Sequence, residues 1–159
     1  MQRRDGLTDD VAPQYASRTL EVSGPRPVPA ARRAIAVVAA WIIPGAGHLT
    51  LGRYGRALLF FVVITGAFIL GLALHGRLYW PVASEEATML PFDLITVLWF
   101  FAQIGSGLCY VVSYLMGFGI TPEPWSPTFE YGNTFMFLAG LLNYLVAHDA
   151  FDIAAGRKR

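Results

Sequence analysis

Four long apolar runs, separated by short polar stretches, dominate the chain after residue 33. Their apolar residues come in blocks, without the polar stripe that repeats along an amphipathic surface helix. As a helix, the second run would measure about 27 Å, which nearly matches a hydrocarbon core of about 30 Å. The pattern predicts an all-α integral membrane protein, a helical bundle with four spans at about residues 34–51, 57–74, 92–118 and 133–152.

The two ends of the chain are polar and differ from the predicted transmembrane domain, residues 34–156. Residues 1–33 carry four prolines and six arginines and lack the apolar core of a signal peptide, so we expect a flexible polar tail. Residues 157–159 form a short basic end. The fourth span is the weakest because three polar residues follow its apolar part closely, and it crosses only if they reach the interface: His148, Asp149 and Asp152.

Composition supports the assignment as a membrane protein and limits the kinds of partner that the chain is expected to bind. Of the 159 residues, 55% are hydrophobic and 14% are charged, whereas soluble domains have about 25% charged residues. The mean hydropathy is +0.47. Basic residues cluster next to the apolar runs rather than over one broad face, which argues against nucleic acid and leaves the lipid bilayer as the expected partner. The single cysteine, Cys109, cannot form an internal disulfide.

The distribution of lysine and arginine predicts how the spans are oriented. Cations gather on the cytoplasmic side of membrane proteins. With four spans and a cytoplasmic N-terminus, the outer side holds only Arg53 and Arg56, which run against the rule. The inner side holds Arg18, Arg26, Arg32, Arg33, Arg77, Arg157, Lys158 and Arg159. If the first run were re-entrant and three spans remained, the split would be six against four, so we expect four spans with both termini cytoplasmic in the inner membrane.

A stretch rich in proline and glycine separates the first two runs. Proline lacks an N–H and clashes with the preceding turn, so Pro44 should break the first helix near Ile43. Glycine permits the dihedrals of a tight corner. Backbone left unpaired at this depth must be covered by protein or water, so we expect a packed corner rather than a lipid-facing loop. The predicted corner comprises Pro44, Gly45, Gly47, His48, Gly52, Arg53, Gly55 and Arg56.

Two stretches carry a resemblance to known proteins. The segment "PGAGHLTLGRYGRALLFF" resembles the hairpin of small bacterial membrane proteins that are distantly similar to the two-transmembrane-helix domain family. The segment "GNTFMFLAGLLNYLVAHDAFDIAAGRK" is similar to the C-terminal part of one such group, a domain of unknown function. One departure is Thr50, where such hairpins often carry an aromatic residue. The resemblance implies a multi-pass bacterial membrane protein and brings no activity with it.

His48 is the sharpest candidate for chemistry. It could bind a metal or a tetrapyrrole or move a proton, or it could close the corner by bonding a carbonyl that Pro44 leaves free. Zinc needs three or four convergent ligands. In the four-span topology His75 and His148 lie near the opposite membrane face from His48, so no shared metal site is expected.

Other polar residues near the spans are weaker candidates. His148 and Asp152 are four apart and could pair on one helix face, with Asp149 pointing elsewhere. The alternative is an interfacial helix end whose acids are matched by the C-terminal cations. Asp93 suits a helix start. Gln103 and Asn143 are residues that often join membrane helices, although polar groups at such depth are also functional suspects.

Small residues recur every four positions in the third run. They form a smooth stripe of the kind that lets membrane helices approach closely, within the bundle or against another subunit. Ala67 and Gly71 give a smaller match on the second run. The stripe comprises Gly105, Cys109, Ser113 and Gly117.

Three functions follow from these features. The first, which the sequence favours, is a non-enzymatic structural or accessory protein that assembles with itself or a larger membrane complex and needs no cofactor. The second is a membrane enzyme or carrier that uses His48 and the polar residues of the fourth span. Proximity of His48 to Asp93 or Asp149 would favour this second function. The third is a pigment- or haem-binding subunit with His48 as axial ligand.

Overall fold

The computed structural model describes residues 28–81 and 93–158, and the regular structure within them is helical. The helices are α2 (Ala30–Ile42), α3 (Ala46–Thr50), α4 (Tyr54–Ala73), α5 (Leu94–Ile104), α6 (Leu108–Leu115) and α7 (Phe129–Ala154). Most of the tail expected at residues 1–33 lies outside the described residues. Where the chain is described, α2 begins at Ala30, a few residues before the predicted first span.

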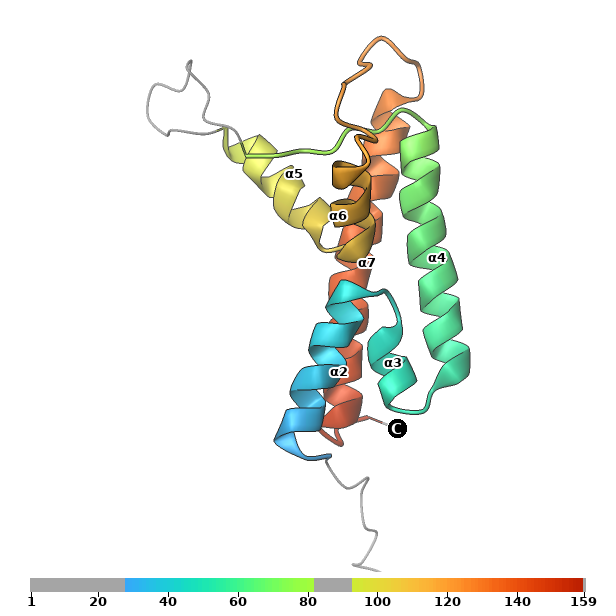
Figure 1. Cartoon of the computed structure of the whole chain (residues 1–159), viewed down its shortest axis with the longest axis vertical. Helices are drawn as coiled ribbons and strands as arrows, with labels where there is room; N and C mark the ends of the chain where they lie inside the picture. Colours follow the sequence, from blue (N-terminus) through green and yellow to red (C-terminus); the bar gives the residue numbers. More distant parts are fainter. Residues whose placement is uncertain (1–27, 82–92, 159) are drawn as a thin grey trace, which may run out of the picture.

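Two helices, α4 and α7, are each long and apolar enough to cross a membrane, which fits a helical membrane protein. They run side by side (Figure 1). Gly71 permits their close approach, since a Cβ there would lie 2.5 Å from the Met136 side chain and 2.8 Å from the Gly132 carbonyl oxygen. Phe68 and Met136 are fully buried in the core next to this contact.

The first predicted span is a hairpin. The 13 residues of α2 extend about 20 Å, the chain turns at Pro44, and α3 runs back along α2 (Figure 1). The guanidinium of Arg32, at the start of α2, donates to the carbonyl oxygen of Thr50, at the end of α3, at 3.2 Å. Residues 34–51 are therefore not shown as one span, because the helix broken by Pro44 folds back.

The third predicted span is also a hairpin. The axes of α5 and α6 meet at 111°, with a break at residues 105–107. Gly107 has φ of +61°, a conformation that favours glycine. Both outer ends of this pair lie at the same end of the molecule (Figure 1). A continuous helix over residues 92–118 is therefore not observed, and residue 92 itself lies outside the described residues.

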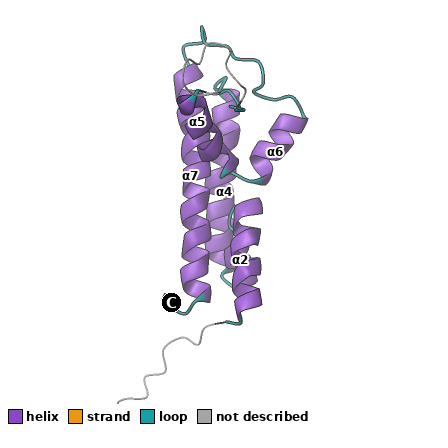
Figure 2. Cartoon of the chain, turned by 90° about the vertical axis from the view of Figure 1, so that its left-hand side faces the viewer, coloured by secondary structure: helices purple, strands orange, loops and turns teal. Residues whose placement is uncertain are grey.

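The described chain thus repeats one order of elements, a hairpin followed by a long helix, in opposite directions. The hairpin α2–α3 enters from the end that holds both termini of the described chain, and α5–α6 enters from the other end (Figure 1). In the perpendicular view α2 lies against the lower half of α7, whereas α6 leans away from the upper half (Figure 2). The regions predicted as four spans form two long helices, α4 and α7, and two pairs of shorter helices.

Candidate functional site

The proline-glycine corner lets α3 pack closely against α2, α4 and α7. Gly45 has φ of +81°, and a Cβ there would collide with the backbone of Ala57 in α4. A Cβ on Gly47 would lie 2.5 Å from the carbonyl oxygen of Ala36 and 2.9 Å from the methyl of Ala150 in α7. The corner is therefore a close backbone packing site that brings α3 against the C-terminal part of α7.

The rest of the predicted corner forms the turn into α4. The backbone N–H of Arg53 donates to the carbonyl of His48 at 2.9 Å, and Gly52 adopts φ of +76° between them. Gly55 faces open space, and Arg56 is exposed in the first turn of α4. These residues lie at the same end of the molecule as the two termini of the described chain, and not at the opposite end as the four-span prediction required (Figure 1).

His48 is buried and bound to a carboxylate. Its side chain is 0% exposed, and its Nε2 lies 3.1 Å from Oδ2 of Asp149 in α7. Its ring packs against Phe60 with the centroids 5.0 Å apart. Nδ1 is buried and has no hydrogen-bond partner among the described residues. The side chain thus joins α3 to α7 and bonds no carbonyl freed by Pro44.

Asp149 connects this histidine to the basic end of the chain. Its side chain is 27% exposed, and Oδ1 accepts from Nζ of Lys158 at 3.0 Å. Asp152 lies 3.6 Å from Lys158 and 3.4 Å from Arg157. The hydrogen bond with Asp149 and the charge of that carboxylate raise the pKa of Lys158. The C-terminal cations therefore match both acids at the end of α7.

The other histidines do not join His48. His148 is exposed and contacts Phe151, with no bond to Asp152 among the described residues. His75 lies at the opposite end, 3.8 Å from Glu123. The described residues contain no group of three or more histidine, cysteine or acidic side chains that could hold a metal ion.

Asn143 bridges the two hairpins in the middle of the bundle. Its Nδ2 donates to the carbonyl oxygen of Trp41 at 3.0 Å and to that of Gly105 at 2.9 Å. Trp41 lies at the end of α2 and Gly105 directly follows α5, where helices leave carbonyls without a partner. Gly107 sits against the end of α2, and a Cβ there would collide with the carbonyl of Trp41. One side chain of α7 thus holds the inner ends of both hairpins together.

Other buried polar groups hold the extended segment that follows α4. Gln103 donates to the carbonyl of Arg77 at 2.8 Å and accepts from the N–H of Tyr79 at 2.9 Å. The side-chain oxygen of Asn133 accepts from the N–H of Arg77 at 2.8 Å, and the hydroxyl of Tyr110 donates to the carbonyl of Tyr79 at 2.7 Å. These side chains provide hydrogen-bond partners for backbone N–H and C=O groups of the extended segment, which has no helix or sheet partners.

Asp93 caps α5. Its carboxylate accepts from the N–H of Ile95 at 3.1 Å and from the hydroxyl of Thr96 at 2.9 Å. These hydrogen bonds lower the pKa of Asp93, led by the one from Thr96. Asp93 lies at the end of the molecule opposite to His48, so the structure brings His48 to Asp149 and not to Asp93 (Figure 1).

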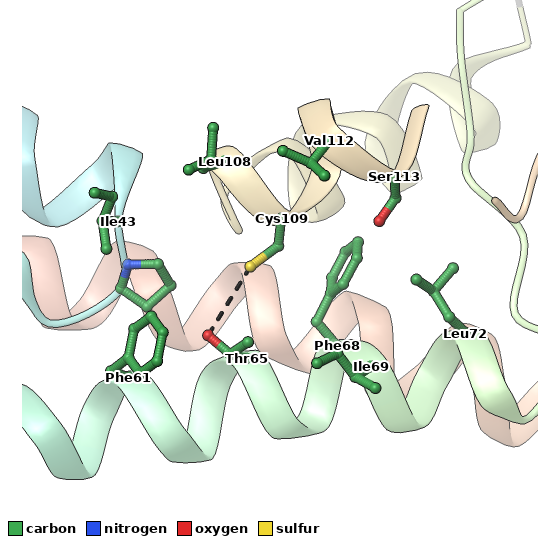
Figure 3. A pocket seen from close by; sticks show the side chains of 11 residues that line it. Ile43, Phe61, Thr65, Phe68, Ile69, Leu72, Leu108, Cys109, Val112 and Ser113 are labelled. Carbon is green, nitrogen blue, oxygen red and sulfur yellow. Dashed lines mark hydrogen bonds between the residues drawn. The ribbon is translucent and has the colours of Figure 1, made fainter. Parts of the chain in front are cut away.

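The four-residue stripe is divided by the break in the third run. Gly105 is buried against Gly140 and Tyr144 of α7. Cys109 and Ser113 line an apolar groove of about 290 Å³ between α6, α4 and the tip of the first hairpin (Figure 3). Gly117 lies beyond α6, and a Cβ there would meet nothing within 4 Å. The stripe is therefore not one continuous helix face.

Figure 3 shows how α6 approaches α4. Cys109 points toward Thr65, with Sγ and Oγ1 4.0 Å apart. Ala67, two residues further along α4, packs against the core, and Gly71 lies where α4 approaches α7. The small residues therefore make separate close contacts on different helices.

Two of these contacts correspond to alternatives that the sequence left open. Proximity of His48 to Asp149 is the contact that favours a membrane enzyme or carrier, and the structure places the two side chains 3.1 Å apart, although no spacing rule connects positions 48 and 149. Matching of the fourth-span acids by the C-terminal cations is the alternative to a His148–Asp152 pair, and the contacts of Lys158 with Asp149 and Asp152 agree with it. Nothing in the sequence indicated that Tyr110 bonds the extended segment, because a tyrosine in an apolar run is common in membrane helices.

The described residues define a class: a helical protein with two helices long and apolar enough to span a membrane, and two hairpins whose inner ends meet at Asn143 of α7. Within that class, the chain belongs to a family described as a family of unknown function (DUF6677), which matches residues 35–159. Neither the curated proteins nor the solved structures compared with the chain include a match.

Proposed function

We propose that the chain is a non-enzymatic protein of the bacterial inner membrane that serves as an assembly or accessory component. The observation that supports this most is the use of its buried polar side chains. Gln103, Asn133 and Asn143 donate to or accept from backbone groups at helix ends and in the extended segment. They stabilise an unusual backbone path, and none of them lines the apolar groove between α4 and α6.

The proposed topology has α4 and α7 as spans and both hairpins as re-entrant segments. Such broken backbone is tolerated in a membrane where protein covers it, and Pro44, Gly45 and Gly107 are buried. The end that holds the termini carries the described cations Arg32, Arg33, Arg53, Arg56, Arg157 and Lys158, here called the basic end, whereas Arg77 lies at the other end. If the basic end is cytoplasmic, the distribution follows the positive-inside rule. Arg53 and Arg56, which violate the rule in the four-span topology, then also lie on the cytoplasmic side.

Labelling of single cysteines tests this topology. In a Cys109→Ser background, Gly55→Cys places a thiol at an open position of the basic end, and Trp125→Cys places one at the exposed opposite end. We expect a membrane-impermeant maleimide added to intact spheroplasts to label position 125 and not position 55. Labelling of both positions from outside would restore the four-span topology and overturn the one with two hairpins.

Assembly is supported by the exposed face of α5. This half-length helix projects obliquely from the bundle (Figure 1), and its residues Leu94, Ile95, Leu98 and Phe101 are each more than half exposed. We expect the protein purified in mild detergent to be larger than one chain. Alanine at Leu98 and Phe101 should reduce that size, whereas alanine at Leu59 and Val62 on α4 should not. A monomer without a stoichiometric partner, in detergent and in nanodiscs, would contradict the proposal.

A carrier that moves protons is the second candidate, and one observation favours it. His48 is oriented by Asp149 and has a buried Nδ1 without a partner in the described part of the chain. In proteoliposomes that contain a pH-sensitive dye, such a carrier would pass protons, and His48→Gln and Asp149→Asn would each abolish the flux. Flux equal to that of protein-free liposomes would exclude this candidate. The same preparation tests haem binding by its absorption spectrum.

A further inference from the structure

A groove between α2 and α7 opens at the basic end. It measures about 470 Å³ and is lined by Ala30, Arg33, Ala34, Val37, Val38 and Phe151. Arg33 is the charged residue of this lining, and the other walls are apolar. Because these residues occupy successive turns of α2, the groove extends from a guanidinium at the end of the molecule along an aliphatic surface.

In the described part of the chain, Arg33 has no side-chain acceptor, unlike Arg32, Arg157 and Lys158. Arg32 donates to the carbonyl of Thr50, and Lys158 and Arg157 pair with acids of α7. Within the described residues Arg33 forms no ion pair and no side-chain hydrogen bond, and its Nε is buried without a partner. Since a partly buried guanidinium without an acceptor is unfavourable, an anion at this point would be stabilised.

A second cation lies next to the opposite wall. The guanidinium of Arg157 stacks over the ring of Phe151, 5.7 Å from its centroid. Its contact with Asp152 is 3.4 Å long and exposed, which leaves donors of the guanidinium available. Two arginines therefore flank one apolar groove, and arginine presents a planar fork of donors that matches a phosphate.

We propose that this groove binds an anionic phospholipid. The phosphate lies on Arg33, with Arg157 nearby, and an acyl chain follows Val37, Val38 and Phe151 toward the middle of the bundle. Basic pockets between helices on the cytoplasmic side bind such headgroups. A free phosphate would use the arginines and leave the apolar walls exposed, whereas a lipid covers both. The inference rests on the proposed membrane location but not on assembly.

Lipid retention by the full-length chain tests the proposal. The protein is purified in detergent, mixed with equimolar phosphatidylglycerol and phosphatidylcholine, and examined by native mass spectrometry. We expect one preferentially retained phosphatidylglycerol, and about a tenfold loss of that preference in Arg33→Gln. Arg56→Gln removes the same charge from an exposed position of the basic end and should keep the preference. Val38→Trp should lower retention without changing charge, because it fills the groove.

Three outcomes would overturn the proposal. Equal losses in Arg33→Gln and Arg56→Gln would indicate general attraction to the basic end. Full competition by millimolar inorganic phosphate, with Val38→Trp unaffected, would indicate a free-anion site. A wild type without preference would indicate that another occupant, such as residues 1–27 of the same chain, covers the groove. Circular dichroism in phosphatidylcholine bicelles verifies folding of each variant, and a misfolded Arg33→Gln is replaced by Arg33→Met, with the same expected loss.

Discussion

Asn143→Leu should release the inner ends of the two hairpins. Leucine has the same number and branching of side-chain heavy atoms as asparagine and suits the apolar interior, so the change removes chiefly the two hydrogen bonds from Nδ2 to the carbonyls of Trp41 and Gly105. Both carbonyls lie where a helix ends, and the side chain of Asn143 is completely buried, so water cannot replace it easily. The loss falls on the contact between the hairpins and not on the packing of α4 with α7.

The expected destabilisation is about 2 to 6 kcal/mol. A buried carbonyl left without a donor costs about 1 to 3 kcal/mol, and two are affected. Side-chain hydrogen bonds between membrane helices average only about 0.6 kcal/mol, because the unfolded state in the membrane also finds partners. Two such bonds give a lower limit of about 1 kcal/mol, so a value well above it would show that the carbonyls find no other donors.

Unfolding in mixed micelles, titrated with sodium dodecyl sulfate and followed by circular dichroism, measures this difference. Leu145→Ala, an exposed position on the same helix, is the control and should change stability little. Hydrogen exchange adds a local readout, in which residues 40–43 and 105–109 should lose protection more than α4. Wild-type stability in Asn143→Leu, together with unchanged exchange at both hairpin ends, would refute the bridging role.

Two further predictions concern helix packing and pH. Gly140→Ala should destabilise the protein by about 1 to 3 kcal/mol, because the added Cβ collides with the carbonyl of Ala102. Gly66→Ala is the control: its Cβ faces open space, so it should stabilise α4 slightly. Equal effects of the two substitutions in thermal unfolding would contradict the close contact at Gly140. The folded-state pKa of Lys158 is raised by Asp149, so its contribution to stability is complete below about pH 10 and is lost as the pH rises through the raised pKa. The melting temperature of wild type should therefore fall more than that of Lys158→Gln between about pH 10 and 12, and parallel curves would exclude a contribution from this pair.

The sequence by itself indicated the class of protein and the place where the first helix breaks. Apolar blocks and scarce charges indicated helices in a membrane, because few other structures can bury so much apolar surface with all backbone groups paired. Pro44 and Gly45 located the first corner, since proline removes a donor and glycine permits a positive φ there. The recurrence of Gly105, Cys109 and Ser113 pointed to close contacts, although it did not show that the helix ends between the first two of them.

Only the tertiary structure decided which way the chain continues after each break. Hydropathy is the same for a straight span and for a hairpin of equal length, so residues 34–51 and 92–118 read as spans. The direction is decided by contacts between distant positions. His48 with Asp149 holds the first hairpin to the end of α7, and Asn143 holds both hairpins where their helices end. Such pairs leave no periodicity in the chain, because their energy depends on geometry that exists only once α7 has packed against both hairpins.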